Sequence, residues 1–345
     1  MVPDGLTELI EPTPAENRAR AYRDICTELP DDPSTPGVAL QWIEQGRTRT
    51  GETPVSTFRV AFWNAERGHA PVHAAGLLRQ SEADIALLCE LDNGVARTGQ
   101  RHTARETAQH FGTDYLYAVE FIELENATEH TRGFHGNAIL GRTALSDPIL
   151  IRFPEDEDWR SGTNRDRRLG SRMALAARVM LDGHSVVVAT THLESHAGPE
   201  QRGAQMKMLV AALDSYADGR PVLIGGDFNT RTATKDAMRD TDARRALARE
   251  HPDAFIRPHT REPLFEVAAR AGYTWLPCNQ PLPTERPRTD DPDRPRFRLD
   301  WFFARGLICE NSRNIPAETP CGTSLSDHDA ITTDIRLSEP RQITP

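Results

Sequence analysis

The stretch Leu223-Ile224-Gly225-Gly226-Asp227-Phe228-Asn229-Thr230 joins an apolar run to a carboxylate and an amide. The apolar residues predict a buried strand, and the two glycines allow its backbone to approach a neighbour closely. Because residues i and i+2 of a strand point to one side, Asp227 and Asn229 are expected to converge. A carboxylate that activates water beside an amide that holds an oxyanion suits hydrolysis of a phosphate ester. The same two residues would also suit an ordinary turn.

The composition is that of an ordinary globular protein of 345 residues, 38% of them hydrophobic and 27% charged. No apolar run approaches the roughly 20 residues of a membrane span, and no secretory signal is visible, so membrane insertion is not expected. The five cysteines form no CxxC pair, which argues against zinc ribbons and disulfide frameworks and favours a cytoplasmic location. A net charge of −10 argues mildly against a protein that coats nucleic acid, without excluding a nuclease with a local basic groove.

Three regions are distinguished by their sequence: an N-terminal extension at 1–56, a main domain at 57–338 and a tail at 339–345. The extension is expected to pack on the main domain, with helices near Pro14–Cys26 and Val38–Gln45. Strands are expected in the main domain at Phe58–Trp63, Ile85–Cys89, Tyr115–Val119, Ala138–Leu140, Met173–Met180, Ser185–Thr191, Pro221–Ile224, Asp300–Phe303 and Ala330–Ile335. Helices are expected at Val72–Gln80, Thr103–His110, Pro199–Tyr216 and Lys235–Arg249. This ratio predicts an α/β layered sandwich of two packed sheets flanked by helices.

Two long segments interrupt this pattern, Pro154–Arg172 and Thr274–Arg298, and both are rich in arginine. Loops of this length in a compact domain are usually functional or mobile. The arginines of the first segment suit a solvated loop, but Arg172 leads directly into a strand and is a candidate to face a site. Lysine is scarce, since Lys207 and Lys235 are the only two in the chain.

Polar side chains stand at or next to the ends of several of the expected strands. They are Asn64 and Glu66, Glu90, His192 with Glu194 and Ser195, Asp227 with Asn229, Asp300, and finally Asp327 with His328 just before the last strand. Carboxylate and amide oxygens suit a hard divalent cation, which also keeps several waters and uses substrate phosphate oxygens. Glu90 is the best single ligand candidate, with Asn64 and Asp327 near it.

These residues belong to short motifs that occur in a recognisable order. The motifs are Asn64-Ala65-Glu66, Glu90, Gly136-Asn137-Ala138-Ile139-Leu140, Thr191-His192-Leu193, Gly226-Asp227-Phe228-Asn229, Leu299-Asp300-Trp301 and Ser326-Asp327-His328. From about Thr57 to Leu337 the chain resembles the endonuclease/exonuclease/phosphatase superfamily, which includes DNase I-like nucleases, abasic-site endonucleases, sphingomyelinases and inositol polyphosphate 5-phosphatases. The resemblance implies a four-layered α/β sandwich, with two mainly antiparallel sheets packed face to face and flanked by helices.

The resemblance also implies a cofactor, Mg²⁺ or Mn²⁺, held by Glu90 with help from Asn64. In this scheme Asp327 supports the metal shell. Asp227 orients or deprotonates the attacking water, and Asn229 holds the phosphoryl oxygens or a second metal. The implied reaction is in-line attack of water on phosphorus.

Two histidines complete the implied machinery. His328, paired with Asp300, would contact the scissile phosphate or act as the base, and His192 would stand near the leaving group. Both aspartates flanking His328 could instead cap turns, and His192 could be a satisfied core histidine. Further candidates for contact with substrate are Glu66, Asn137, Arg172 and Ser195.

The family resemblance indicates the type of bond better than the substrate. The segments Leu91–Gly99 and Thr131–His135 could form a small polar pocket beside the metal, which favours a small or medium phosphorylated molecule. The alternative is a nonspecific or structure-selective endo- or exonuclease. A third interpretation is a catalytically inactive binding module. The presence of every candidate acid, base and metal ligand argues against it.

Overall fold

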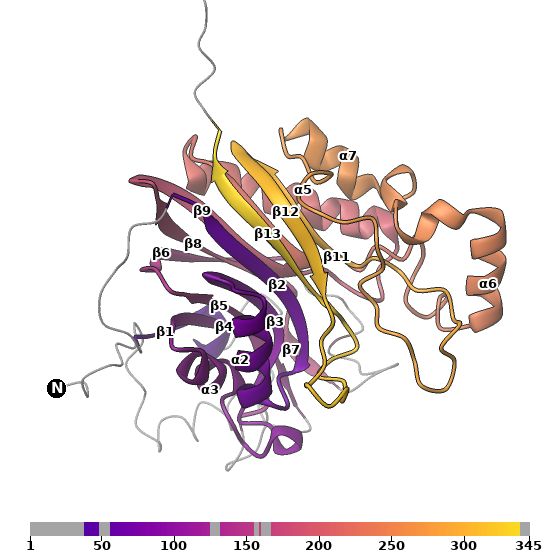
Figure 1. Ribbon diagram of the computed structural model, residues 1–345, viewed down its shortest axis with the longest axis horizontal. Coiled ribbons are helices and arrows are strands. Elements are labelled where there is room, and N and C mark those ends of the chain that lie inside the picture. The colour runs from indigo at the N-terminus through magenta and orange to yellow at the C-terminus, as the bar shows by residue number, and fades with distance from the viewer. Residues whose placement is uncertain (1–37, 48–55, 125–131, 155–158, 160–166, 339–345) are drawn as a thin grey trace, which may run out of the picture.

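The computed structural model describes residues 38–47, 56–124, 132–154, 159 and 167–338. Within these residues two sheets pack face to face, and helices cover the outer face of each sheet (Figure 1). The chain therefore forms the four-layered α/β sandwich expected from its sequence.

The two sheets differ in size. The larger has the order β1-β4-β5-β3-β2-β13-β12, with β7 paired along β4, and the smaller has the order β11-β10-β9-β8-β6. The larger sheet consists of β1 (Ile43–Gly46), β2 (Phe58–Arg67), β3 (Ile85–Asn93), β4 (Asp114–Glu123), β5 (Phe134–Gly141), β7 (Arg168–Gly170), β12 (Leu307–Ile315) and β13 (Ala330–Leu337). The smaller consists of β6 (Ser146–Arg152), β8 (Met173–Leu181), β9 (His184–His192), β10 (Val222–Asp227) and β11 (Asp300–Arg305). The pairs β2–β3 and β9–β10 are parallel, and the other described pairs are antiparallel.

The helices α2 (Pro71–Gln80) and α3 (Thr103–Phe111) pack on the larger sheet, and α5 (Pro199–Ala217) and α7 (Pro263–Arg270) pack on the smaller one. Helix α6 (Thr241–Glu250) lies at the edge of the sandwich in Figure 1 and shares a small separate core with Phe255, Phe297 and Leu299. Single 3₁₀ turns are η1 (Val38–Gln41), η2 (Ala96–Thr98), η3 (Pro252–Phe255) and η4 (Pro258–Thr260). Among the described helices, none combines the length and the apolar character needed to cross a membrane.

Strand β2 shows why a nearly continuous apolar run forms a central strand. Phe58, Val60 and Phe62 point into the core between the sheets, whereas Ala61 and Trp63 point towards α2 and α3. Since both faces of the strand are buried, both sets of alternating side chains must be apolar. Burial of each large side chain contributes roughly 2–3 kcal/mol to stability.

The two glycines of β10 allow the close approach that the sequence indicated. A Cβ atom on Gly226 would lie 2.6 Å from Thr191 Cγ2 and 2.8 Å from the Thr191 carbonyl oxygen. A Cβ atom on Gly225 would lie 2.9 Å from Leu87 Cδ1 in the opposite sheet. Any larger side chain at either position would therefore force apart the strands that carry the site.

Two expected helices differ from the structure. Val38–Gln45 is not a helix, because the chain here forms η1 and then the edge strand β1 along β4. Glu44 receives hydrogen bonds from Tyr115 at 2.6 Å, so tertiary contacts override the local helix propensity. The helix expected from Lys235 begins only at Thr241, where the side chain of Asp240 caps it by accepting from the Asp242 amide at 2.9 Å.

The other expected helices and strands are present, with boundaries shifted by a few residues. The structure adds elements that the sequence pattern did not indicate, namely β1, β6, β7, β12 and α7. The helix expected at Pro14–Cys26 and the tail at 339–345 lie outside the described residues.

Candidate active site

The site is built where two strands of the larger sheet lose their regular register. In β3 the pairing with β5 shifts between Leu88 and Leu91, and Glu90 within this bulge has a φ of 57°. In β2 the pairing with β3 shifts between Asn64 and Arg67. A bulge turns a side chain away from the regular alternation, and a positive φ at a non-glycine residue is strained. The bulge and the strained backbone at Glu90 thus go together with the direction of its carboxylate into the site.

Asn64 connects the carboxylates of the two sheets. Its Nδ2 donates to Glu90 Oε1 and to Asp227 Oδ2, each at 3.1 Å. Arg67 Nη1 donates to Glu90 Oε2 at 2.8 Å. Burial alone would raise the pKa of Glu90, but Arg67 and nearby histidines lower this pKa well below its usual value. Glu90 is therefore an ionised carboxylate held at the floor of the site.

A turn after β10 brings Asp227 and Asn229 together. The sequence predicts that strand alternation does so, which is wrong because the strand ends at Asp227. β10 ends at Asp227, Asn229 has a φ of 51°, and the Asn229 amide N–H donates to Asp227 Oδ1 at 2.9 Å. Asn229 Nδ2 donates to the Leu193 carbonyl at 2.9 Å, and its Oδ1 accepts from Arg231. The amide of Asn229 thus fixes the end of β9 beside the end of β10.

His328 forms a buried pair with Asp300. Its Nδ1 lies 2.8 Å from Asp300 Oδ2, and its Nε2 lies 3.8 Å from Asp227 Oδ2. Burial opposes the charged imidazolium, but Asp300, Asp327 and Asp227 raise the pKa of His328 well above its usual value. His328 is therefore a cation that presents its Nε2 towards Asp227.

His192 is held differently, because its neighbour is a cation. Arg172 Nη1 lies 2.9 Å from His192 Nδ1, while His192 Nε2 lies 3.5 Å from Asp227 Oδ2. Burial and the charge of Arg172 lower the pKa of His192 to about 3. Since Arg172 can only donate, His192 is neutral and carries its proton on Nε2, facing Asp227.

Arg172 is held by two buried glutamates. Its Nη1 donates to Glu120 Oε1 at 2.5 Å and its Nε donates to Glu194 Oε2 at 3.2 Å. Burial raises the pKa of Glu120 to about 7. In the amide orientation that satisfies both ends of its side chain, Asn137 donates to Glu120 Oε2 at 3.2 Å. This network fixes the guanidinium that orients His192.

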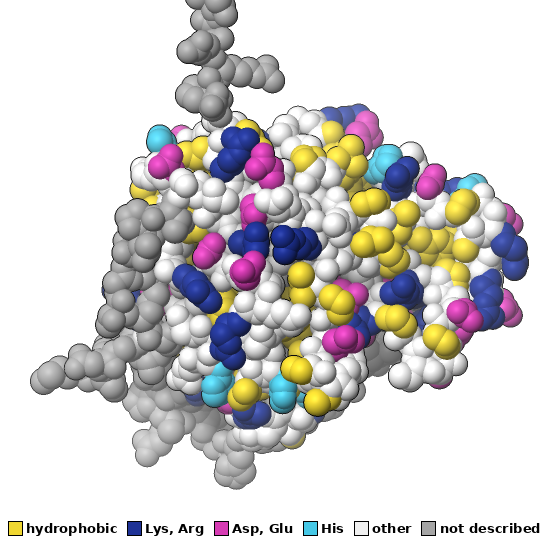
Figure 2. All heavy atoms as spheres, viewed as in Figure 1, with side chains coloured by type: hydrophobic (Ala, Val, Ile, Leu, Met, Phe, Trp, Pro, Cys, Tyr) yellow, Lys and Arg dark blue, Asp and Glu magenta, His cyan; other side chains and the backbone are white. Residues whose placement is uncertain are grey.

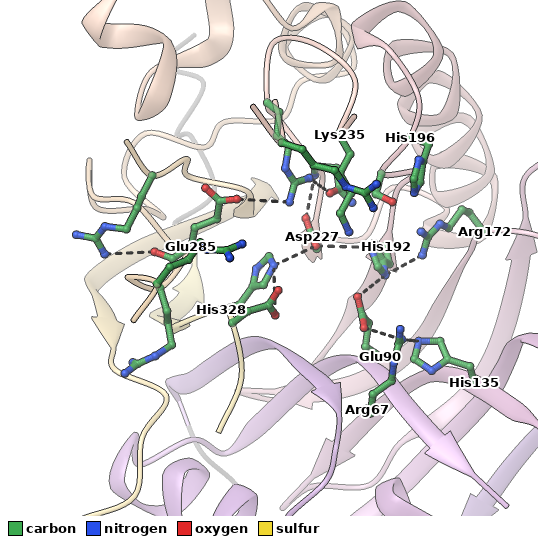
Figure 3. A pocket seen from close by; sticks show the side chains of 18 of the residues that line it. Arg67, Glu90, His135, Arg172, His192, His196, Asp227, Lys235, Glu285 and His328 are labelled. Carbon is green, nitrogen blue, oxygen red and sulfur yellow. Dashed lines mark hydrogen bonds and ion pairs between the residues drawn. The ribbon is translucent and has the colours of Figure 1, made fainter. Parts of the chain in front are cut away.

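These groups open into one cavity of about 310 Å³, and in Figure 3 Asp227 lies at its centre between His192 and His328. Among the described residues, eleven lysine and arginine side chains and four carboxylates line it. Of the residues expected from the sequence, the lining includes Glu90, Arg172, His192, Ser195, Asp227, Asn229, Asp327 and His328. The cavity is therefore strongly positive although the chain as a whole is acidic.

The remaining expected residues lie around this cavity and do not line it. Asn64 and Asp300 stand behind Glu90 and His328, to which they bond. Glu66 is exposed, and its Oε2 accepts from the Asp327 amide at 2.8 Å. Asn137 is fully buried. Glu66 and Asn137 therefore support the backbone and the Arg172 network and do not reach the cavity.

Several lining residues are not among the site residues that the sequence predicts. Arg67 and His135 flank Glu90, and Lys235 and Glu285 stand on other sides of the cavity (Figure 3). Lys235 carried a usable signal, because it is one of only two lysines in the chain. The arginines between 286 and 296 also line the cavity, and they come from the long segment already marked as functional or mobile.

The polar pocket expected from Leu91–Gly99 and Thr131–His135 forms only in part. Described residues of the two segments lie together, since the Gly94 carbonyl accepts from the Arg132 amide at 2.8 Å. Their charged groups, however, bond to one another: Asp92 contacts His135 at 2.9 Å and Arg97 at 2.8 Å. His135 is the member of this group that lines the cavity.

Comparison with known proteins now adds to this geometry. A model of the Endonuclease/Exonuclease/phosphatase family matches residues 61–328, which include every candidate catalytic residue. The chain belongs to the endonuclease/exonuclease/phosphatase family. Enzymes of this family are hydrolases that act on phosphoesters and generally use divalent metals. Comparison with curated protein sequences gives no match.

Solved structures with this fold come from several organisms. An endonuclease/exonuclease/phosphatase from Beutenbergia cavernae is 18% identical with a TM-score of 0.55, and the alignment covers 82% of this chain and 72% of that one. The human Nocturnin catalytic domain with bound sulfate is 16% identical with a TM-score of 0.55, and the alignment covers 88% of this chain and 100% of that one. Zebrafish TDP2 complexed with single-strand DNA product is 19% identical with a TM-score of 0.51, and the alignment covers 81% of this chain and 99% of that one. At these identities the likeness establishes the fold alone.

Within the described part of the chain, two groups of residues could hold a divalent cation. Asp227, Asp300 and His328 offer ligand atoms within 4.8 Å of one another, but His328 Nδ1 is already bonded to Asp300. Glu90 and Asp227, bridged by Asn64, offer oxygen atoms to the cavity, and Glu90 keeps 19% of its side chain exposed. An all-oxygen set with ionised Glu90 fits Mg²⁺ or Mn²⁺ better than the buried group around His328.

Proposed function

We propose that the protein is a divalent-metal-dependent phosphoesterase that hydrolyses a small or medium phosphorylated molecule by in-line attack of water. The observation that carries the proposal is the convergence on Asp227 Oδ2. Asn64 Nδ2 lies 3.1 Å from this oxygen, His192 Nε2 3.5 Å and His328 Nε2 3.8 Å. One carboxylate oxygen thus meets one amide donor, one neutral imidazole and one cationic imidazole.

Each of these groups has a role that follows from its charge. Asp227, an acceptor, orients the attacking water and takes its proton. His328, kept positive by Asp300, donates from Nε2 to a phosphoryl oxygen and opposes the negative charge that accumulates there. His192 is neutral and donates from Nε2, so it suits hydrogen bonding to an oxygen of the substrate without itself carrying charge.

Glu90 and Asp227, with Asn64 between them, are the residues that would hold Mg²⁺ or Mn²⁺. Asp327 is 70% exposed beside His328 and would support this shell through water. When bound, the cation would supply positive charge against the phosphoryl oxygens.

The size of the cavity supports a small or medium substrate. Its volume of about 310 Å³ is within the range of small-molecule sites. On the face shown in Figure 2, basic and acidic side chains are interspersed and form no continuous basic stripe that could follow a duplex. The second candidate, a nuclease, is favoured by the number of cations in the cavity, which would also suit a polynucleotide. The free state of the four described cysteines supports a cytoplasmic location.

The test is hydrolysis by metal-stripped protein after addition of Mg²⁺ or Mn²⁺. The substrates are a chromogenic phosphomonoester, a chromogenic phosphodiester, a single-stranded oligonucleotide and supercoiled plasmid, with His328→Ala as the control. Metal-dependent turnover of the small esters alone, lost in the variant, would support the proposal. Metal-dependent nicking of the plasmid, lost in the variant, would establish the nuclease instead.

A further inference from the structure

One wall of the cavity is built by a segment that pairs directly with the catalytic histidine. Glu285 forms an isolated antiparallel bridge with His328, and the Arg286 amide donates to the Asp327 carbonyl at 2.8 Å. In Figure 3 Glu285 lies on the side of His328 that faces away from His192. The arginines that follow Glu285 therefore border the reacting centre on its His328 side.

Several cations of this wall already have carboxylate partners. Arg244 pairs with Glu285 at 2.7 Å, and Arg231 lies 3.7 Å from the same carboxylate. Arg286 pairs with Asp329 at 2.5 Å. Arg288 likewise pairs with Asp290 at 2.6 Å. The carboxylates nearest to this wall are thus already paired with these four arginines.

Three lining cations have no such partner within the described part of the chain: Lys235, Arg294 and Arg296. Arg294 Nη2 donates to the carbonyls of Met238 at 3.0 Å and Arg239 at 2.8 Å, while its buried Nε has no partner. Arg296 makes one bond of 3.3 Å to the Glu285 carbonyl. Backbone carbonyls position these guanidinium groups without neutralising them.

The electrostatic environment of Arg294 is unfavourable in the free protein. Burial and the neighbouring Arg244 lower the pKa of Arg294, and this lowering exceeds the opposing effect of Glu285 and Asp291. A cation held beside other cations costs stability unless an anion joins it. A divalent metal at Glu90 would add positive charge to the same cavity, so a single phosphate would leave much of this charge uncompensated.

We propose that Arg294 and Arg296, in the segment that follows Glu285, form a second anion site, distinct from the place where Asp227 and His328 meet the reacting phosphate. The natural substrate is then a small molecule that carries at least two phosphoryl groups, one hydrolysed and one held by this wall. This inference rests on the proposed function and narrows its substrate class. A small molecule is favoured over a polynucleotide because the cations converge on one cavity of about 310 Å³ in a chain of net charge −10.

The decisive variant is Arg296→Gln, because this side chain makes one weak hydrogen bond and its loss removes charge with little structural change. The matched control is Arg270→Gln on α7, which removes an exposed arginine that pairs with Glu266 and does not line the cavity. Phosphate release is measured from adenosine 5′-monophosphate and adenosine 3′,5′-bisphosphate, which share one scaffold. A single-stranded oligonucleotide is the third substrate.

We expect wild-type protein to prefer the bisphosphate in kcat/KM, and Arg296→Gln to reduce that preference about tenfold, the worth of one charged hydrogen bond. Arg270→Gln should retain the preference. Equal losses on both nucleotides, or no loss on either, would overturn the second site. Preference for the oligonucleotide over both would overturn the small-molecule assignment.

Binding without catalysis separates this inference from the proposed function. Calorimetry in EDTA compares inorganic pyrophosphate with inorganic phosphate on metal-stripped wild-type and variant protein. Tighter binding of pyrophosphate that weakens about tenfold in Arg296→Gln supports the second site even if neither nucleotide is hydrolysed. Identical pyrophosphate affinity in wild type and Arg296→Gln would refute the second site even if the protein is an active phosphoesterase.

Discussion

The substitution Asp300→Asn isolates the charge that keeps the His328 imidazole positive. Asp300 is fully buried, its Oδ2 lies 2.8 Å from His328 Nδ1, and asparagine has nearly the same shape. The variant retains an oxygen that can accept from Nδ1 and loses the negative charge. The consequence should therefore be electrostatic and appear in the pH dependence of catalysis.

The magnitude follows from the distance. Two unit charges 2.8 Å apart interact by about 6 kcal/mol at an effective dielectric constant of about 20. This corresponds to a downward shift of about 4 units in the pKa of His328, since one unit is about 1.4 kcal/mol. Asp327 lies 3.9 Å from His328 Nε2 but is 70% exposed, so in near-aqueous surroundings its removal should shift the pKa by less than about 1 unit.

The assay is kcat/KM for a chromogenic phosphoester as a function of pH, for wild type, Asp300→Asn and Asp327→Asn. The pKa of His328 is raised well above its usual value, so wild-type activity that needs the imidazolium should persist through neutral pH. In Asp300→Asn the same activity should decline as pH rises through the neutral range, with a loss of about 10²–10³ at pH 8. Asp327→Asn should follow the wild-type profile closely.

An Asp300→Asn profile that keeps the wild-type shape and is only scaled down would show that the charge of Asp300 does not control His328. Equal shifts of the profile in Asp300→Asn and Asp327→Asn would also contradict the prediction, because burial would then have no effect on the interaction between each carboxylate and His328. Melting temperatures within a few degrees of wild type are needed to assign the loss to the site and not to unfolding.

Three further predictions concern the metal, the buried network and the edge strand. Glu90→Gln should reduce Mn²⁺ affinity and turnover about hundredfold or more, and unchanged binding in calorimetry would contradict its role. Arg172→Met leaves Glu120 and Glu194 buried without their shared cation, so the free energy of unfolding in urea should fall by about 3–5 kcal/mol; a loss below about 1 kcal/mol would show that the network relaxes. Burial opposes ionisation of Glu44, yet contacts with His102 and a tyrosine lower its pKa to about 2. Its stabilisation, up to about 3 kcal/mol, is present above pH 4.5 and lost towards pH 2, so Glu44→Gln should cost stability at pH 7 but not at pH 2; an equal cost at both would refute the linkage.

The central strands could be predicted from sequence because both their faces are buried. β2 and β10 read as nearly continuous apolar runs, and the motif residues follow directly at their ends. The edge strands could not, since β6 and β12 are partly exposed and their polar positions dilute the pattern. The sequence predicts a helix where β1 stands, because the pairing of β1 with β4 leaves no signal in local propensity.

The sequence by itself determined which chemical groups are available and where along each strand they stand. Glu90, Asp227 and His192 each come at the end of an apolar run and His328 precedes one, and apolar runs become buried strands whose ends meet at one edge of a sandwich. Local pattern was sufficient here because burial of apolar side chains is the main force that arranges the strands.

The tertiary structure alone decided what each group does. The charge of His328 depends on Asp300, the neutrality of His192 depends on Arg172, and the aim of Glu90 depends on a bulge in β3. Electrostatic interactions depend on distances of a few ångströms between groups far apart in the chain, and on whether water separates them. Sequence order carries neither quantity, so the protonation states and the positive wall of the cavity emerge only when the two sheets pack together.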